Sequence, residues 1–288
     1  MKKLLLISIS VLITVTSCEL IKDDSDPNIF FKIGENLEYK FNDINLYDSS
    51  AHILYFKTTH EEFKDIRDES FTFLENGDTI YSGTFYSGYL SYIPLGPIIL
   101  SPPHMYGDYA LRIEIWRDDQ PDRRNNPRII ELLKEHDLLH SGLSGIIDSL
   151  EINGTQLTFM FTVSNMDQND LLILDLDKIG LNLFHYFTNG LNISDRNAHE
   201  LVFSSNIEHQ QPDPWNSFNI EWLSLLKSGD SRQFTINYTM ESPLNPGEYF
   251  AFFEFPGLAY QVTLDNLNQG NNRIWLGDIR LTKEIIYK

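Results

Sequence analysis

Apolar residues recur at every second position through much of this chain, and this period of two limits its possible folds more than any other feature. The pattern is clear in residues 51–58, 156–163, 232–238 and 249–255. Successive side chains of a β-strand point to opposite faces of a sheet, so the pattern is typical of strands that bury one face. We therefore predict a mostly β protein.

These predicted strands fall into two sets, one in each half of the chain. In the first set, residues 71–74 lead into Asn76-Gly77, a dipeptide that readily adopts the positive φ values of a tight hairpin turn, and residues 79–81 follow. The chain has 288 residues, of which 42% are hydrophobic and 13% aromatic, enough for one large or two ordinary domains. The two sets of strands favour two domains.

One helix is predicted between the two sets. Asn126 can cap it, Pro127 suits its first position, apolar residues follow on one stripe, and Gly142 ends it. We expect this helix to link the domains. The expected divisions are domain one at 28–117, a charged linker with the helix at 118–145, and domain two, with an aromatic-rich insertion, at 146–288.

A short motif recurs in both domains. Residues 107–109 read Gly-Asp-Tyr and residues 247–249 read Gly-Glu-Tyr, each just before a predicted strand and about one domain length apart. The motif resembles the tyrosine corner of immunoglobulin-like sandwiches, in which a tyrosine hydroxyl bonds to an upstream backbone group. The resemblance implies two immunoglobulin-like β-sandwich domains with Tyr109 and Tyr249 buried. Chance recurrence is the alternative.

The charge of the chain excludes one large class of partners. Its 41 Asp and Glu residues outnumber 22 Lys and Arg, giving a net charge of -19 and a pI near 4.7. The resulting field repels polyphosphate, so we expect no nucleic-acid partner. The single cysteine, Cys18, cannot close an intramolecular disulfide.

The first 17 residues have the pattern of an export signal. Lys2 and Lys3 precede an apolar run that is shorter than the roughly 20 residues needed to span a membrane. Residues 15–18, Val-Thr-Ser-Cys, resemble the lipobox of bacterial lipoproteins. This resemblance implies that Cys18 is acylated and becomes the first residue of the mature chain, so that the membrane is a partner through the lipid. An unmodified cysteine near a cleavage site is the alternative.

A polar, acidic segment at 18–27 is expected to act as a flexible tether. Within it, Lys22, Asp23 and Asp24 resemble the export signal that sends lipoproteins of the Bacteroidota to the cell surface, although they lie a few residues later than usual. The resemblance implies a lipid-anchored protein of the bacterial outer membrane that faces the cell surface. An anchor facing the periplasm is the alternative.

Several patterns suggest chemistry but lack the residues that the chemistry needs. His136 and His140 have the helical spacing of zinc ligands, yet no third ligand is evident, and the end of a helix explains them better. Ser144 lacks the flanking spacing of a nucleophile elbow. The acids in residues 167–177 lack the order of a calcium loop, although calcium remains an alternative to solvated turns. We therefore predict no catalytic residue, metal or cofactor.

Aromatic side chains in predicted loops are the candidate binding residues. Aromatic faces beside Asn and Asp are typical of sugar or peptide recognition. The candidates are Tyr89 in domain one and Tyr186, Phe187 and Trp215 in domain two. Packing into the core is the alternative for each, and for Trp215, which follows Pro214, both interpretations remain open.

The signal, the tether and the β pattern together resemble surface lipoproteins of the Bacteroidota built from immunoglobulin-like modules. The resemblance implies a non-enzymatic binding or assembly module, with an envelope protein or a glycan as its partner. The alternative is a cell-envelope hydrolase that acts on a glycan or a peptide through carboxylates, which cannot be picked out among 41 acids.

Overall fold

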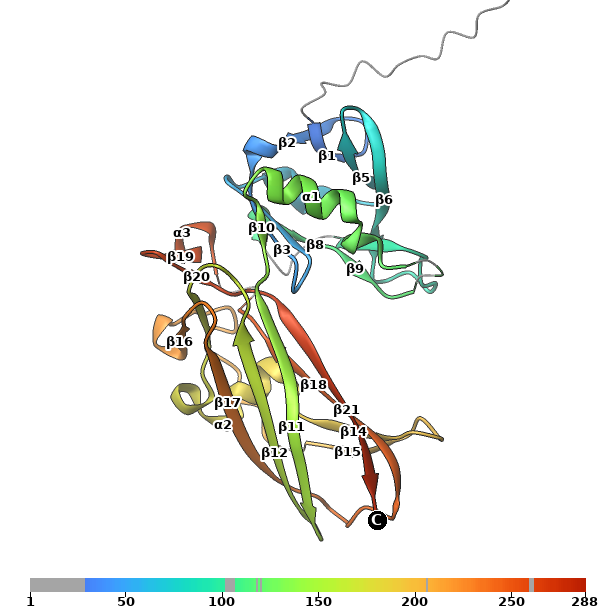
Figure 1. Cartoon of the computed structure of the whole chain (residues 1–288), viewed down its shortest axis with the longest axis vertical. Helices are drawn as coiled ribbons and strands as arrows, with labels where there is room; N and C mark the ends of the chain where they lie inside the picture. Colours follow the sequence, from blue (N-terminus) through green and yellow to red (C-terminus); the bar gives the residue numbers. More distant parts are fainter. Residues whose placement is uncertain (1–28, 102–106, 118, 120, 206, 259–261) are drawn as a thin grey trace, which may run out of the picture.

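The computed structural model describes residues 29–101, 107–117, 119, 121–205, 207–258 and 262–288. These residues form five sheets and three short helices, which confirms the predicted mostly β class and is consistent with β-sandwich packing. Figure 1 shows the strands gathered in two units along the long axis, and the C-terminus at the end away from the N-terminal unit. Cys18, Lys22, Asp23 and Asp24 lie outside the described residues. No helix in the described part of the chain is long and apolar enough to span a membrane.

The N-terminal unit contains two sheets with strand orders β2-β1-β5-β6-β7-β9 and β10-β3-β4-β8. The strands are β1 (Ile29–Ile33), β2 (Leu37–Lys40), β3 (Ile44–Asp48), β4 (Ile53–Phe56), β5 (Ser70–Glu75), β6 (Asp78–Ser87), β7 (Pro97–Ser101), β8 (Ala110–Arg112), β9 (Glu114–Ile115) and β10 (Leu139–His140). The predicted hairpin is confirmed, because Asn76 and Gly77 join β5 to β6 with φ values of 50° and 85°.

The helix predicted as a linker belongs to the N-terminal unit. Asn126 caps α1 (Pro127–Glu135) by accepting a hydrogen bond from the backbone of Arg128. Its buried face, with Ile129 and Leu133, packs into the same core as the phenylalanines of β1 and β5. β10 follows and pairs in parallel with β3. The predicted role as a linker is therefore not confirmed: an apolar helical stripe needs a sheet to cover it, and the sheets of the first unit provide that cover.

The C-terminal unit contains three sheets with strand orders β11-β12-β17, β16-β13-β20-β19 and β15-β14-β18-β21. Its elements are β11 (Leu143–Asn153), β12 (Gln156–Asn165), β13 (Leu171–Leu174), α2 (Leu176–Thr188), β14 (Asn192–Asp195), β15 (Leu201–Ser204), β16 (Leu223–Leu226), β17 (Ser231–Thr239), β18 (Gly247–Pro256), α3 (Leu264–Leu267), β19 (Asn268–Gln269), β20 (Asn272–Ile274) and β21 (Asp278–Tyr287). Buried residues alternate with partly buried ones in β12 and, from Phe234 onward, with exposed ones in β17, which confirms the period of two. Phe161 and Phe253, with ring centroids 4.8 Å apart, join two sheets in one core.

The two predicted tyrosine corners have different outcomes. Tyr249 is buried, and its hydroxyl donates to the backbone carbonyl of Asn245, four residues upstream, at 2.6 Å. This contact matches the prediction. The Tyr109 hydroxyl instead donates to the carbonyl of Val262 in the other unit at 2.7 Å, so the prediction of a second corner was wrong. Tyr109 is buried because it forms part of the junction between the units.

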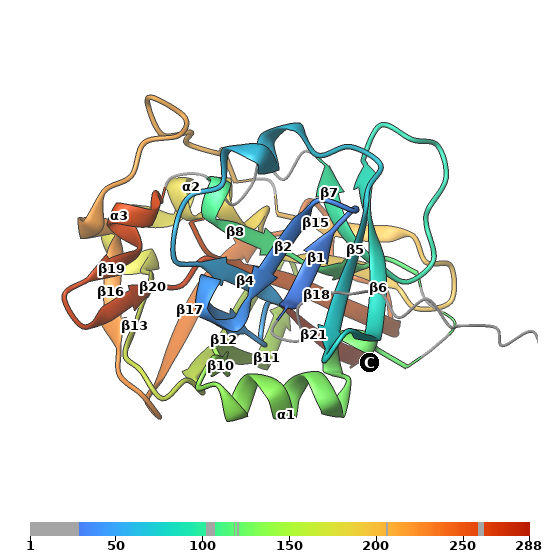
Figure 2. The same ribbon diagram turned by 90° about the horizontal axis from the view of Figure 1, so that it is seen from above.

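The two units are in direct contact. Residues of β3, β4 and β8 belong to the hydrophobic core cluster of the C-terminal unit, among them Ile53, Tyr55 and Ala110. Arg112 of β8 forms a two-pronged ion pair with Asp278 of β21, with 2.7 Å between Nη2 and Oδ1. Figure 2 shows, from above, that the N-terminal unit covers one end of the long C-terminal strands. The junction is therefore packed with side chains from both units.

Candidate functional site

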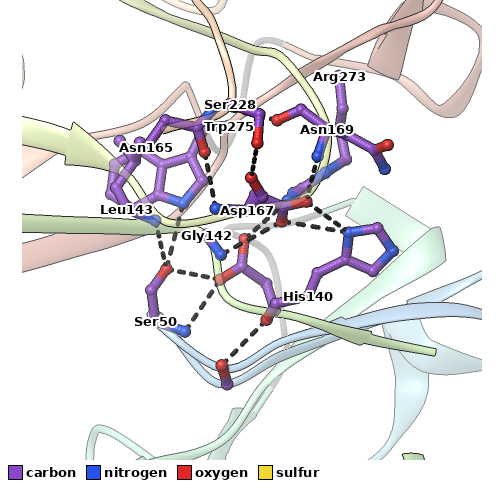
Figure 3. Close-up of polar contacts among 12 residues, drawn as sticks. Ser50, His140, Gly142, Leu143, Asn165, Asp167, Asn169, Ser228, Arg273 and Trp275 are labelled. Carbon is purple, nitrogen blue, oxygen red and sulfur yellow. Dashed lines mark hydrogen bonds and ion pairs between the residues drawn. The ribbon is translucent and has the colours of Figure 1, made fainter. Parts of the chain in front are cut away.

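A buried ionic cluster lies where the two units meet (Figure 3). We define it as Asp48 at the end of β3, His140 in β10, Asp167 after β12 and Arg273 in β20. All four residues are buried, and Arg273 is 4% exposed. Each comes from a different part of the chain, so the cluster exists only when both units are folded and joined.

The guanidinium of Arg273 lies between the two carboxylates. Its Nη2 is 3.1 Å from Oδ2 of Asp48 and 3.2 Å from Oδ2 of Asp167. The guanidinium also lies over the ring of Tyr55, 5.6 Å from the ring centroid. On the other side of Asp167, Nδ1 of His140 is 2.9 Å from Oδ1. Arg273 thus joins an acid of the N-terminal unit to an acid of the C-terminal unit.

Neighbouring backbone and hydroxyl groups hold the two carboxylates in place. Ser50 Oγ donates to Oδ1 of Asp48 at 2.6 Å and accepts from the backbone of Leu143 at 3.2 Å. The backbone of Gly142 donates to Oδ2 of Asp167 at 3.2 Å. Gly142 has a φ of 60°, and a Cβ there would lie 2.1 Å from Ser50 Oγ. Both its backbone angle and this close approach therefore require glycine.

The environment of Asp167 keeps its carboxylate charged. Burial alone would raise its pKa, but the hydrogen bonds from His140 and from the backbone of Asn169, with the charge of Arg273, lower the pKa to about 2. A carboxylate that is stabilised in this way is a poor proton acceptor, because general bases work best when their pKa is near the operating pH. The cluster is therefore suited to holding charges together.

The geometry does not supply a nucleophile. A serine hydrolase needs a serine hydroxyl hydrogen-bonded to the histidine. Here Ser50 Oγ faces Asp48, and Ser49 Oγ donates to the backbone carbonyl of His140. Among the described residues, no group of three His, Cys, Asp or Glu side chains is placed to hold a metal ion. We interpret the cluster as an ionic joint between the units.

Sequence reasoning missed this cluster. It placed His136 and His140 together at a helix end, but only His136 lies there, as the residue that ends α1, with its ring stacked 3.7 Å from that of Phe41. His140 belongs to β10 and to the cluster. The partners of Arg273 are 225 and 106 residues away in the sequence, and no local pattern relates them.

The four aromatic candidates do not form one surface. Tyr186 and Phe187 lie in the last turn of α2 with ring centroids 5.2 Å apart, and Phe187 also packs 6.0 Å from Trp222. Both are partly buried. Trp215 is 50% exposed in the loop that leads to β16, and Tyr89 is 94% exposed on the N-terminal unit. Exposure favours presentation over packing for Trp215 and Tyr89.

Tyr89, the candidate predicted in domain one, belongs to the apolar loop, which we define as residues 87–96 between β6 and β7. Its exposed large apolar side chains are those of Tyr89, Leu90, Tyr92, Ile93 and Leu95. The exposed Trp116 lies outside the loop, next to it. The loop is held from below by the buried Tyr86, whose hydroxyl donates to the backbone carbonyl of Leu90 at 2.8 Å. The ring of Tyr86 packs edge-on against Tyr92 and Trp116, at 5.7 and 5.5 Å.

A cleft of about 580 Å³ opens between the units near Tyr109. Two acids line it: Asp108 from the N-terminal unit and Asp265 from α3. Asp108 also lies 3.4 Å from the ammonium of Lys64. Paired acids in a cleft are the feature that a carboxylate hydrolase would need, so this cleft is where the hydrolase alternative is tested.

No protein-family model matches the chain, and neither does any curated protein. Among solved structures, part of the chain is similar to a β-glucosidase from Kluyveromyces marxianus, both in selenomethionine-labelled form and in complex with glucose. These comparisons have 10% identity and TM-scores of 0.24 and 0.23; they cover 51% of this chain and span only 14% of the β-glucosidase. A likeness this weak carries no argument about fold or function.

Proposed function

We propose that this chain is a lipoprotein of the bacterial outer membrane, anchored through acylated Cys18 and facing the cell surface, that binds or assembles with a partner and catalyses no reaction. The observation that supports this proposal most directly is that the buried charged groups at the junction pair with one another. Asp48, Asp167 and Arg273 are committed to one another across the junction. Such a joint holds two units in a fixed relation, which suits a module that presents surfaces.

Each unit would be an immunoglobulin-like β-sandwich. The hydroxyl of Tyr249 bonds to Asn245 as a tyrosine corner requires, which favours this assignment for the C-terminal unit. In the N-terminal unit, residues from two sheets share one core, as in a sandwich.

The partner, an envelope protein or a glycan, would contact the C-terminal unit at the exposed surface around Trp215. Trp215 is half-exposed and Tyr186 lies at the edge of the core. Tryptophan and tyrosine are enriched among residues that contribute most to binding.

This partner surface is tested by capture from the native envelope with the acylated full-length chain. Trp215→Ala should reduce capture by at least about 30-fold, which corresponds to about 2 kcal/mol for a binding anchor. Trp215→Phe should retain part of it, and Ile286→Ala, which removes an exposed side chain from β21, should bind normally. Normal capture by Trp215→Ala would contradict the proposal.

The lipid anchor is tested at Cys18. Cys18→Ala removes the only thiol that can be acylated, so incorporation of radiolabelled fatty acid should be abolished and the chain should accumulate in soluble or unprocessed form. Measuring the label separates the anchor from any other membrane contact. A variant that still incorporates fatty acid and remains in the membrane fraction would exclude the lipoprotein assignment.

The hydrolase alternative is favoured by one observation: two acids, Asp108 and Asp265, line the cleft between the units. If the cleft is catalytic, the wild-type chain should hydrolyse an envelope glycan or peptide, and Asp265→Asn should abolish that activity without changing stability. Glu248→Gln, which changes an exposed acid far from the cleft, is the control. A wild-type chain without hydrolytic activity on these substrates would exclude this alternative.

A further inference from the structure

We propose that the apolar loop seats the N-terminal unit in the interface of a lipid bilayer. This inference rests on the proposed lipid anchor, because it assigns the loop to the membrane that holds Cys18. Three large side chains of the loop are mostly accessible to solvent: Tyr89 is 94% exposed, Tyr92 60% and Ile93 55%. Side chains of this size and exposure in one short segment need an apolar partner.

The absence of charge around the loop is the second observation. No Asp, Glu, Lys or Arg occurs from Thr79 to Gly107, although 22% of the chain is charged and the net charge is -19. Charged side chains are costly to place in a bilayer, so a segment that enters one must lack them. The segment that carries the apolar loop meets this condition within a strongly acidic chain.

The residue types in the loop favour lipid over a glycan. Tyrosine and tryptophan are enriched at membrane interfaces, where their rings sit at the level of the headgroups, and Leu90, Ile93 and Leu95 add aliphatic surface. Sugar recognition needs amide or carboxylate groups beside the aromatic faces, and residues 87–96 contain no Asn, Asp, Gln or Glu. The polar side-chain groups in this segment are the hydroxyls of Ser87, Ser91, Tyr89 and Tyr92.

The base of the loop differs from its tip. A Cβ added to Gly96 would lie 2.3 Å from Nη2 of Arg123, so this guanidinium sits against the backbone where the loop ends. The backbone of Gly96 also donates to the carbonyl of Arg117 at 2.8 Å. The base of the loop is therefore next to a charged group, whereas its tip carries apolar side chains.

The loop is preorganised for this contact. β6 and β7 pair in parallel. The chain must therefore run back from the end of β6 to the level at which β7 begins, and residues 87–96 form this connection outside the sheet. The hydroxyl of Tyr86 donates to the backbone carbonyls of Leu90 and Tyr92, which fixes the turn. A loop that is already ordered loses little conformational freedom on binding.

The position of the loop agrees with the anchor. Ten residues, 19–28, separate Cys18 from Ile29, the first residue of β1, and the distance from Cys18 to Ile29 is at most roughly 40 Å when this segment is extended. The N-terminal unit is therefore kept near the bilayer. In Figures 1 and 2 the loop after β6 projects from the flank opposite α2, α3 and β16. Seating this loop turns the flank with the proposed partner surface toward solvent.

The test uses the unacylated chain 19–288, which keeps every described residue and lacks both the signal and Cys18. Binding is measured by co-sedimentation with vesicles of phosphatidylcholine and phosphatidylethanolamine, which carry no net charge. The wild-type chain should sediment with the vesicles, and the double variant Tyr89→Ser, Ile93→Ser should partition at least about tenfold less. The matched control is Leu201→Ser, Ile286→Ser, which removes two exposed apolar side chains from the C-terminal unit and should bind as the wild type does.

A second readout locates the contact. Trp116 lies beside the loop and is the only tryptophan of the N-terminal unit, so Trp116→Phe should remove most of the fluorescence quenching caused by brominated lipid. Three outcomes would overturn the proposal: no vesicle binding by the wild-type chain, equal binding by the loop variant, or loss of capture of an envelope protein by the loop variant without vesicle binding. None of them bears on acylation of Cys18 or on Trp215, so the proposed function would stand or fall separately.

Discussion

At the scale of single residues, Arg273 is the side chain on which the ionic cluster depends. Its guanidinium faces two buried carboxylates, those of Asp48 and Asp167. Removing one partner of a buried ionic group leaves the other charges uncompensated, which costs more than the group contributed when intact.

We expect Arg273→Met to lower the free energy of unfolding by about 3 to 5 kcal/mol, because methionine fills a similar volume but leaves Asp48 and Asp167 without their cation. Urea unfolding followed by circular dichroism measures the change. The matched control is Arg280→Met on β21, where an exposed pair with Glu254 at 3.5 Å should contribute less than about 1 kcal/mol. Equal effects of the two variants would contradict this role for the cluster.

Two buried histidines give the fold a pH dependence at mildly acidic pH. Burial, with the charge of Arg124, lowers the pKa of His52 to about 4, and burial, with the charge of His209, lowers that of His185 to about 4. The unfolded chain therefore binds more protons than the folded chain between about pH 6.5 and 4, and stability falls as the pH is lowered through this window.

We expect each histidine to remove on the order of 2 kcal/mol of stability between pH 7 and pH 4. Denaturant titrations at several pH values measure this slope. His185→Gln keeps a hydrogen-bonding side chain next to Tyr238 and should reduce the slope, whereas His199→Gln, on the exposed turn between β14 and β15, should leave it unchanged. A slope that is unaffected by His185→Gln would show that this group does not titrate as described.

At the scale of elements, two tryptophans differ in how much of the side chain is buried. Trp275 follows β20, is 1% exposed and stacks near Phe255. Trp215 lies in the loop before β16 and is half-exposed. The structure thus separates packing from presentation for one residue type.

We expect Trp275→Ala to cost about 3 to 5 kcal/mol of folding stability and Trp215→Ala less than about 1 kcal/mol. Thermal unfolding of the two variants beside the wild type provides the comparison. A large drop in melting temperature for Trp215→Ala would place Trp215 in the core and remove it from the proposed partner surface.

Elements that depend on residues close together in the sequence were predictable, and features that depend on contacts between distant residues were not. The period of two and the Asn76-Gly77 turn depend on neighbouring residues, so the strands and the hairpin were found. The helix after Asn126 was also found, but its role was not, because the sequence does not say which sheet covers its apolar stripe. Tyr109 was misassigned for the same reason: its partner, Val262, lies 153 residues away.

The candidate site was harder to predict than the fold. An exposed aromatic loop and a buried one have similar compositions, so Tyr89 could be selected but not separated from packing tyrosines. The ionic cluster has no sequence pattern at all, since it depends on how two units meet. The charge-free segment from Thr79 to Gly107 was visible in the sequence, and only the structure shows that its middle part projects.

At the scale of the whole molecule, the junction should make the two units unfold together. Apolar residues of the N-terminal unit lie in the core cluster of the other unit, and the ion pairs of Arg273 and of Arg112 cross the same boundary. Interfaces that are large and apolar resist relative motion of the units.

We expect a single calorimetric transition, with the van't Hoff and calorimetric enthalpies equal, for the chain 19–288. The double variant Arg112→Met, Arg273→Met should separate it into two transitions, because the ion pairs that both arginines make across the boundary are lost. Two transitions in the wild-type chain would show that the units are thermodynamically independent.

The separation of Asp48 from its cation along the chain has a consequence for biosynthesis. Because Asp48 and Arg273 lie 225 positions apart, the N-terminal unit is synthesised long before the residue that neutralises its buried carboxylate. A loop closure of this length is slow relative to local pairing. Until β20 is synthesised, the junction face of the first unit has neither the apolar cover nor the cation that the second unit supplies, so this face is completed only when the last strands of the chain are made.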